Sequence, residues 1–289
     1  MNEKKLYSPS YIRELLNTYG FRFSKSLGQN FLIDGNIVRK ICDEGEISKD
    51  DDILEIGPGI GTLTEELAVR ANKVVAVEID KGLLPILKET LGAYDNVEIV
   101  HGDILKLNLP ELFANKFEKD NIKVVANLPY YITTPIITGL LEAEIDVDCI
   151  LVMVQKEVAN RLCASPGSKD YGSLSVFVQY YTEAEIVLPV PKNVFMPRPN
   201  VDSAVIRLKI RDEKISLKDK DVFFKVVRAA FSKRRKTILN SLTQGLNMEK
   251  DDVREILESA NISPTERAEK LKIEEFAKIS SLFPPFNIY

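Results

Sequence analysis

Between residue 52 and about residue 155, short apolar runs alternate with stretches of helical spacing. The runs are rich in β-branched residues and predict five buried strands: Ile53–Ile56, Val74–Ile79, Val97–Val100, Val124–Ala126 and Ile150–Val154. The stretches between them predict helices, among them Leu63–Arg70, Leu83–Leu91 and Pro135–Leu141. Apolar strands separated by helices are typical of a parallel sheet that is covered on both faces. The pattern therefore predicts an α/β domain.

The pattern differs on either side of this segment. Residues 8–20 predict an N-terminal helix that begins with a Ser-Pro pair. A predicted helix at Leu174–Tyr181 is followed by two strands, Ile186–Val190 and Ala204–Ile210, around a proline-rich loop. Because this pair interrupts the alternation, we expect one antiparallel strand added to a mostly parallel sheet.

Beyond the charged stretch Arg211–Asp221 the pattern is almost entirely helical. Four helices are predicted there: Val222–Phe231, Thr237–Leu246, Asp251–Ser259 and Ile273–Leu282. We therefore predict two domains. Residues 1–211 would form the sheet with an N-terminal helical arm and the cofactor site, and residues 212–289 a small all-helical domain.

Composition argues against several kinds of protein and site. Of the 289 residues 45% are apolar, and the mean hydropathy is −0.08, which is typical of a globular protein. The N-terminus lacks an apolar signal region, and no run approaches the ~20 apolar residues of a membrane span. We therefore expect a cytoplasmic protein with no membrane partner. Three widely spaced cysteines and a single histidine, His101, argue against disulfides, metal sites and a Ser-His-Asp relay.

The charge is unevenly distributed along the chain. The net charge is −4, yet residues 192–211 carry a balance of +4 and residues 222–240 one of +6, which leaves −14 on the other 250. A basic run is commonly no more than a solvated face. Segregation this strong in an acidic chain predicts instead a surface that binds a polyanion.

A glycine-rich turn follows the first predicted strand. The segment Leu54–Thr64 reads LEIGPGIGTLT and opens a helix, where glycines let the backbone approach a ligand closely. It departs from the dinucleotide pattern GxGxxG because Thr62 stands at the third glycine position. Glu78 ends the next strand, where a doubly wound fold uses a carboxylate to bind ribose hydroxyls. A tight turn with a surface acid is the alternative, but the two features together predict a nucleoside-containing cofactor.

Two further strand ends carry polar residues. Asp103 follows the third strand and would turn a carboxylate toward the exocyclic amine of adenine, although Gly-Asp is also an ordinary turn. Asn127 begins the sequence Asn-Leu-Pro-Tyr after the fourth strand. Active groups of open α/β sheets lie at this edge, so both residues are candidates for the site.

The sequence Asn127–Tyr130 suits the methylation of an exocyclic base amine. The lone pair of such an amine is delocalised into the ring, so acceptors aimed at its N–H groups help as positive charge develops in the transition state. The Asn127 side-chain oxygen and the main-chain carbonyl of Leu128 or Pro129 are candidate acceptors. Tyr130 offers a flat face for base stacking. A structural turn with core tyrosines is the alternative.

Together these motifs resemble the adenine-N6 methyltransferases that use S-adenosylmethionine. The segments Ser26–Asp34 (SLGQNFLID) and Val194–Ser203 (VFMPRPNVDS) resemble motifs of the rRNA adenine dimethyltransferases. The basic segment Phe231–Asn240 (FSKRRKTILN) resembles a helix of the members that act on the small ribosomal subunit. The resemblance covers roughly residues 8–283. It implies a Rossmann-like methyltransferase sheet and dimethylation of two adjacent adenosines near the 3′ end of 16S rRNA.

The resemblance also implies roles for individual residues. Cofactor contacts are implied for Asn30, Leu32, Gly57, Glu78, Asp103 and Asn127. Positioning of the target base is implied for Asn127, Leu128, Pro129, Tyr130 and Phe195, the last two on opposite faces of the base. RNA contacts are expected for Arg198, Lys233, Arg234, Arg235 and Lys236. The implied cofactor is S-adenosylmethionine and the implied partner is 16S rRNA within the small ribosomal subunit. We expect a monomer that needs no metal and takes part in subunit biogenesis.

Three alternatives compete with this interpretation. A large-subunit (23S) rRNA methyltransferase of the antibiotic-resistance (Erm) type shares the sheet motifs, but the long helical tail and its basic helix favour the small subunit. An oxidoreductase with a nucleoside cofactor would explain the glycine turn and Glu78, yet it would leave Asn127–Tyr130 and the basic tail without a task. A non-catalytic ribosome-assembly factor would need only RNA binding, an activity that is compatible with methylation.

Overall fold

The computed structural model describes residues 5–24, 27–118, 121–143 and 145–284 and divides the chain into two compact units. The sheet unit is formed by Met1–Ala159 with Glu183–Ile210, and the helical unit by Asn160–Thr182 with Arg211–Tyr289. Ser26, the first residue of the predicted N-terminal motif, lies outside the described residues.

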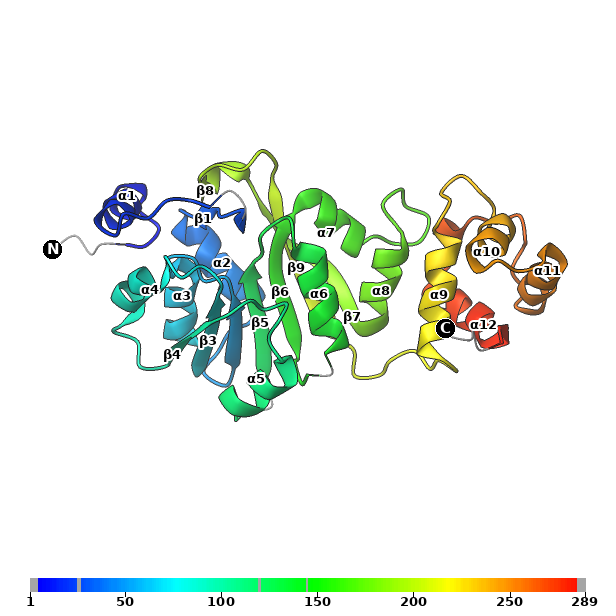
Figure 1. Cartoon of the computed structure of the whole chain (residues 1–289), viewed down its shortest axis with the longest axis horizontal. Helices are drawn as coiled ribbons and strands as arrows, with labels where there is room; N and C mark the ends of the chain where they lie inside the picture. The colour runs from blue at the N-terminus through cyan, green and yellow to red at the C-terminus, as the bar shows by residue number, and fades with distance from the viewer. Residues whose placement is uncertain (1–4, 25–26, 119–120, 144, 285–289) are drawn as a thin grey trace. The chain divides into compact units, whose positions relative to one another are not determined.

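Seven strands form the main sheet of the sheet unit, in the order β4-β3-β2-β5-β6-β9-β7 (Figure 1). Their bounds are β2 (Asp52–Ile56), β3 (Lys73–Glu78), β4 (Val97–His101), β5 (Ile122–Asn127), β6 (Cys149–Gln155), β7 (Thr182–Val190) and β9 (Ser203–Ile210). The neighbours from β4 to β6 pair in parallel, and β9 runs antiparallel to β6. The mostly parallel α/β sheet predicted from the alternation is thereby confirmed.

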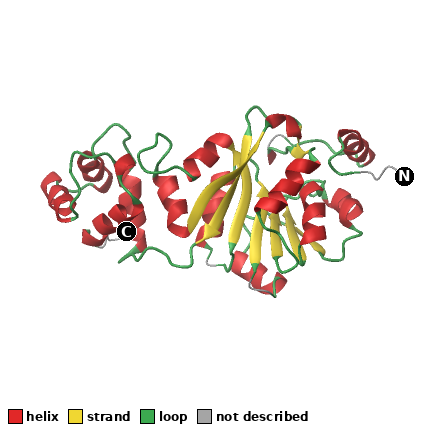
Figure 2. Ribbon diagram, turned by 180° about the vertical axis from the view of Figure 1, so that it is seen from behind, coloured by secondary structure: helices red, strands yellow, loops and turns green. Residues whose placement is uncertain are grey.

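Helices flank this sheet (Figure 2). They are α2 (Gly35–Glu44), α3 (Thr62–Arg70), α4 (Leu84–Leu91), α5 (Leu109–Lys116) and α6 (Thr133–Glu142), followed by α7 (Lys156–Leu162) at the unit boundary. The first helix, α1 (Pro9–Thr18), belongs to the N-terminal arm. The central strand β2 is buried along its whole length, as expected for a strand covered on both faces, whereas the edge strand β4 is only half-buried.

The predicted elements do not include α2, α5, α7 or the short strands β1 (Phe31–Leu32) and β8 (Phe195–Met196), although α2 has apolar residues at helical spacing, Val38, Ile41 and Cys42. Asp34 and Asn108 are the N-cap residues of α2 and α5. The side chain of Asp34 accepts hydrogen bonds from two backbone nitrogens of the first turn, and that of Asn108 accepts one. These capping residues are a local signal of helix starts that periodicity misses. Strands of two residues are too short to show any alternation.

The N-terminal arm packs onto the sheet unit. One face of α1 is buried, through Ile12, Leu15 and Leu16. These side chains belong to an apolar cluster that includes Phe31, Ile60 and Leu83. Strand β1 then pairs antiparallel with β8, which sets Leu32 opposite Phe195. The arm is thus fixed from both ends beside the glycine-rich turn.

The helical unit contains α8 (Ser173–Tyr181), α9 (Lys220–Ala230), α10 (Ile238–Leu246), α11 (Lys250–Ser259) and α12 (Ile273–Leu282). Rings of α8 and α9 interlock: Phe177 lies 5.1 Å from Phe224, and Tyr180 lies 5.7 Å from Phe223, between centroids. These aromatic contacts group residues 160–182 with the helical unit, whereas the predicted boundary at 211 would leave them with the sheet.

Within the described residues, no helix combines the length and apolarity needed to span a bilayer.

Candidate active site

The glycine-rich turn between β2 and α3 has a backbone that glycine adopts most readily. Gly57, Gly59 and Gly61 have φ angles of 71°, 63° and 92°, in the left-handed region that a Cβ disfavours. A Cβ built at Gly57 meets no heavy atom within 4 Å. The main chain at Gly57 therefore borders open space, and a ligand can approach it closely.

Two buried carboxyl groups line the pocket next to this turn. Glu78 is 4% exposed and accepts hydrogen bonds from the backbone nitrogens of Gly59 (3.3 Å) and Asp80 (2.8 Å). Glu55 is 1% exposed, and its Oε2 has no hydrogen-bond partner among the described residues. Burial raises the pKa of Glu55 to about 8, with a further contribution from Glu78, and burial raises the pKa of Glu78 to about 7. Glu78 thus retains acceptor capacity for a ligand, because each of its oxygens accepts only one of these hydrogen bonds.

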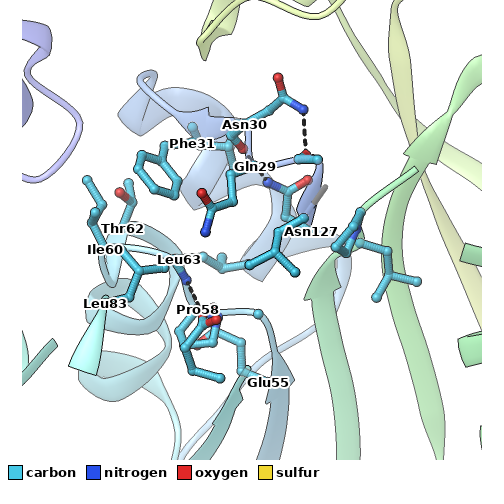
Figure 3. A pocket seen from close by; sticks show the side chains of 18 of the residues that line it. Gln29, Asn30, Phe31, Glu55, Pro58, Ile60, Thr62, Leu63, Leu83 and Asn127 are labelled. Atoms are coloured by element: carbon cyan, nitrogen blue, oxygen red, sulfur yellow. Dashed lines mark hydrogen bonds between the residues drawn. The ribbon is translucent and has the colours of Figure 1, made fainter. Parts of the chain in front are cut away.

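The N-terminal arm supplies one wall of the pocket. Asn30 and Leu32 line it, as predicted, together with Gln29. Gln29 links two loops, because its Nε2 donates to Oδ2 of Asp80 (2.7 Å) and its Oε1 accepts from the backbone nitrogen of Ser24 (3.0 Å). In Figure 3, Gln29 and Asn30 lie on the side of the pocket opposite Glu55. The wall and the edge of the sheet are therefore tied by a side-chain hydrogen bond.

The turn after β5 supplies the adjacent wall. Asn127 donates from its Nδ2 to the carbonyl of Asn30 (3.0 Å; Figure 3), which leaves Oδ1 as the acceptor of this amide. The carbonyl of Pro129 already accepts two hydrogen bonds from the residues that follow it, at 3.2 and 3.1 Å. In the described part of the chain no hydrogen bond reaches the carbonyl of Leu128. Of the two candidate carbonyls, that of Leu128 is therefore the available one.

The two predicted base-stacking residues differ in their surroundings. Tyr130 lines the pocket, and its hydroxyl is hydrogen-bonded to Oγ of Ser203 (2.7 Å). Burial raises the pKa of this hydroxyl. Phe195 does not line the pocket; its ring is 3% exposed and packs in the apolar cluster that contains Leu32. Stacking of Phe195 on a base would therefore require its ring to become exposed.

Asp103 also lies outside the lining of the pocket. Its carboxylate accepts from the backbone nitrogen of Leu105 (3.1 Å) and pairs with Lys106 (3.4 Å). It follows β4, whose last residue, His101, is opposite Glu78 in the parallel register, so both acids belong to the same edge of the sheet. No group of three or more His, Cys, Asp or Glu side chains in the described ranges could hold a metal ion.

The basic cluster lies in the loop between α9 and α10 rather than on a helix, which corrects the prediction for Phe231–Asn240. All four side chains are exposed: Lys233, Arg234, Arg235 and Lys236. Arg234 donates to the carbonyl of Lys169 within the helical unit. Arg198 is exposed on the loop between β8 and β9 of the sheet unit. A loop allows neighbouring side chains to face the same way, which a helix does not.

Three residues that build the site had no predicted role: Gln29, Glu55 and Ser203. Gln29 and Ser203 lie within the two motifs that carry the resemblance, and Glu55 precedes the first glycine. What gives Gln29 and Ser203 their positions is a partner far away in the sequence, Asp80 for one and Tyr130 for the other. A local pattern cannot indicate such a partner.

Comparison with known sequences gives consistent matches over nearly the whole chain. Residues 20–284 match the family described as ribosomal RNA adenine dimethylase. Curated relatives from Geobacillus thermodenitrificans and Clostridioides difficile are each named ribosomal RNA small subunit methyltransferase A. The first is 55% identical and covers 99% of both chains, and the second is 53% identical and covers 96% of both.

Two solved structures are also similar. A dimethyladenosine transferase from Plasmodium falciparum has a TM-score of 0.72 and 28% identity, with 86% of this chain and 95% of that chain covered. The 23S rRNA methyltransferase ErmE has a TM-score of 0.68 and 28% identity, with 87% of this chain and 98% of that chain covered. Both similarities extend over most of the chain.

Proposed function

The chain belongs to the ribosomal RNA adenine dimethylase family, and from that premise we propose its substrate, cofactor and site. It transfers methyl groups from S-adenosylmethionine to N6 of two adjacent adenosines near the 3′ end of 16S rRNA in the small ribosomal subunit, as part of subunit biogenesis. The observation that carries the proposal is one pocket lined by the glycine turn, Glu78 and the Asn127–Tyr130 turn.

The residues of the pocket fit S-adenosylmethionine. The open space beside Gly57 gives room for the methionine part against the main chain. Glu78 keeps lone pairs for two ribose hydroxyls, since each carboxylate oxygen can accept more than the one hydrogen bond it has. Asn30 and Leu32 close the site from the arm. Asp103, at the same edge of the sheet, remains our proposed acceptor for the adenine amine.

The target amine is held by the turn after β5. Oδ1 of Asn127 and the carbonyl of Leu128 accept from the two N–H groups of N6, because the carbonyl of Pro129 is already engaged. Both dipoles are fixed before the reaction, so they stabilise the positive charge that develops on nitrogen without reorganising. When bound, S-adenosylmethionine supplies an electrophilic methyl group and a good leaving group. The protein therefore contributes positioning and dipoles and needs no nucleophile of its own.

The base itself is recognised through stacking. The ring of Tyr130 lies at the pocket with its hydroxyl anchored to Ser203, so its face is fixed in orientation. A base that has been unstacked from the RNA gains a new stacking surface there. Phe195 is the proposed partner on the opposite face, on the condition that its ring becomes exposed when RNA binds.

The exposed basic residues dock the RNA backbone. Lys233, Arg235 and Lys236 have no ion-pair partner in the described part of the chain. Free cations on a loop suit phosphate contacts, which position an enzyme on RNA without reading its sequence. Arg198 would add a contact from the sheet unit. We further propose that the enzyme acts as a monomer without metal.

The fold and site motifs would also serve a 23S rRNA methyltransferase, because ErmE has a similar structure. The full-length relatives at 53–55% identity favour the small subunit. Label transfer from tritiated S-adenosylmethionine tests the choice, with small subunits that lack the modification, naked 16S rRNA and large subunits as parallel substrates. We expect label in the small-subunit rRNA. Label confined to large subunits would reject the proposal, and binding without label would leave only an assembly role.

A further inference from the structure

Tyr131 places a second aromatic ring at the rim of the pocket. The side chain is 55% exposed, and in the described part of the chain its hydroxyl has no hydrogen-bond partner. One side of the ring lies against Gly28, since a Cβ built there would be 3.3 Å from Cδ1 of Tyr131 and 3.9 Å from Cβ of Pro129. Gly28 and Pro129 both line the pocket. One edge of the ring thus lies against Gly28, and more than half of the side chain is open to solvent.

These contacts separate Tyr131 from an ordinary surface aromatic. Single exposed apolar side chains are common and need no function. A tyrosine required for the core would be buried, and one required for its hydroxyl would have a partner. Tyr131 meets neither description. It also leans on the main chain of Gly28, whose φ of 57° and missing side chain let the ring approach.

We propose that Tyr131 is the stacking platform for the nucleotide that flanks the target adenosine; this inference rests on the proposed function. A base that enters the pocket beside Tyr130 leaves its neighbour in the RNA without a stacking partner. The next residue of the protein chain offers that neighbour an aromatic face. Stacking of this kind tolerates any base and is how single-stranded RNA is commonly held. In a substrate with two adjacent adenosines, the platform would hold one adenosine while the other is methylated, and a different flanking nucleotide when the two are exchanged.

The test compares Tyr131→Ala and Tyr131→Phe in methylation of small subunits that lack the modification. Loss of one base–aromatic stack should raise the KM of Tyr131→Ala for subunits by about 5- to 150-fold with kcat little changed. Tyr131→Phe keeps the face and should bring KM back to within about twofold of the wild type. The affinity for S-adenosylmethionine, measured by calorimetry, should stay the same in both. The salt dependence of subunit binding should keep its slope, because the substitution removes no positive charge from the phosphates.

Val69→Ala is the matched control, since Val69 is 59% exposed on α3 and does not line the pocket. An unchanged KM in Tyr131→Ala would overturn the proposal. An equal loss of affinity for S-adenosylmethionine would also overturn it, because the ring would then only support Gly28. The proposed function fails in a different way: wild-type enzyme would label large subunits or neither subunit. If the wild-type enzyme methylates small subunits and Tyr131→Ala has an unchanged KM, only the proposed role of Tyr131 is rejected.

Discussion

Under the proposed function, the amide of Asn127 has two separable functions at its two ends. Nδ2 donates to the carbonyl of Asn30 and so ties the catalytic turn to the arm, while Oδ1 is left for the target amine. Asn127→Ala should lower the single-turnover methylation rate by about 10²- to 10³-fold, the typical cost of one dipole aimed at developing charge. The affinity for S-adenosylmethionine, followed by calorimetry, should change by less than the rate. Near-normal turnover on small subunits would show that Asn127 only shapes the turn.

Glu55 makes the stability of the cofactor-free protein depend on pH. Its pKa is about 8 in the folded protein and about 4.3 in an unfolded chain, so the folded state binds the proton more tightly. This contribution is complete below about pH 4.3 and is lost as the pH rises through about 8. Glu55→Gln removes the free energy that the folded protein loses when this buried carboxyl group ionises. Its melting temperature should exceed that of the wild type at pH 8.5, by about 2–4 °C for each kcal/mol recovered.

At pH 5 the wild-type carboxyl group is neutral in the folded state and only a small part of the contribution is lost, so the two melting temperatures should lie much closer together. Calorimetric scans of both proteins at the two pH values measure this difference. Parallel curves of melting temperature against pH would mean that Glu55 is ionised in the pocket at neutral pH. A second, smaller dependence with the same sign belongs to Glu78, whose folded pKa is about 7.

At the scale of elements, a second hydrogen bond, besides that of Asn127 to Asn30, ties the arm to the pocket. Gln29 on the arm donates to the carboxylate of Asp80 (2.7 Å), which follows β3. Gln29→Glu would oppose two carboxylates and should weaken binding of S-adenosylmethionine by about tenfold, since hydrogen bonds to charged groups contribute roughly 1.5 kcal/mol or more. Adding Asp80→Asn to Gln29→Glu lets an amide at position 80 donate to the carboxylate at position 29. This double variant should therefore recover the affinity for S-adenosylmethionine. Calorimetry gives the affinities, with Asp80→Asn alone as the control. A double variant as weak as Gln29→Glu would reject this function of the bond.

Some elements of the fold can be predicted from the sequence and others cannot. The hydrophobic pattern predicts all seven strands of the main sheet and the helices α8 to α12, and they are observed, whereas α2 is not among the predicted elements despite its apolar face. The pairing of β1 with β8 depends on two residues from each of two distant segments, so no local pattern indicates it. The same pairing buries Phe195, which the resemblance placed at the base. Residues 160–182 join the helical unit through rings of α8 and α9, a contact that requires the tertiary structure.

For the whole molecule, we expect the local distribution of charge to determine the docking of RNA. An overall charge of −4 would disfavour a polyanion, yet ten units of positive charge are concentrated in two segments of 39 residues. The exposed loop 233–236 belongs to one of them. Association with RNA is steered by such local fields rather than by net charge, and it weakens as salt screens them. The segregation is visible in the sequence, and the predicted helices Val222–Phe231 and Thr237–Leu246 already leave this cluster between them, whereas the resemblance placed it on a helix.

Removing the positive charge of the loop separates docking of RNA from stabilisation of the helical unit. Lys233, Arg235 and Lys236 are replaced together by Gln, while Arg234 is kept because it donates to the carbonyl of Lys169. Subunit binding should weaken, and the slope of log affinity against log salt should fall by about 0.7–0.9 for each phosphate that the protein no longer neutralises. A control variant removes the same charge from exposed positions elsewhere in the helical unit: Lys250, Lys272 and Lys278. It should change the slope far less, and neither variant should alter the affinity for S-adenosylmethionine. If the cluster instead stabilises the protein through its acidic residues, the loop variant would keep the wild-type salt slope and melt at a lower temperature.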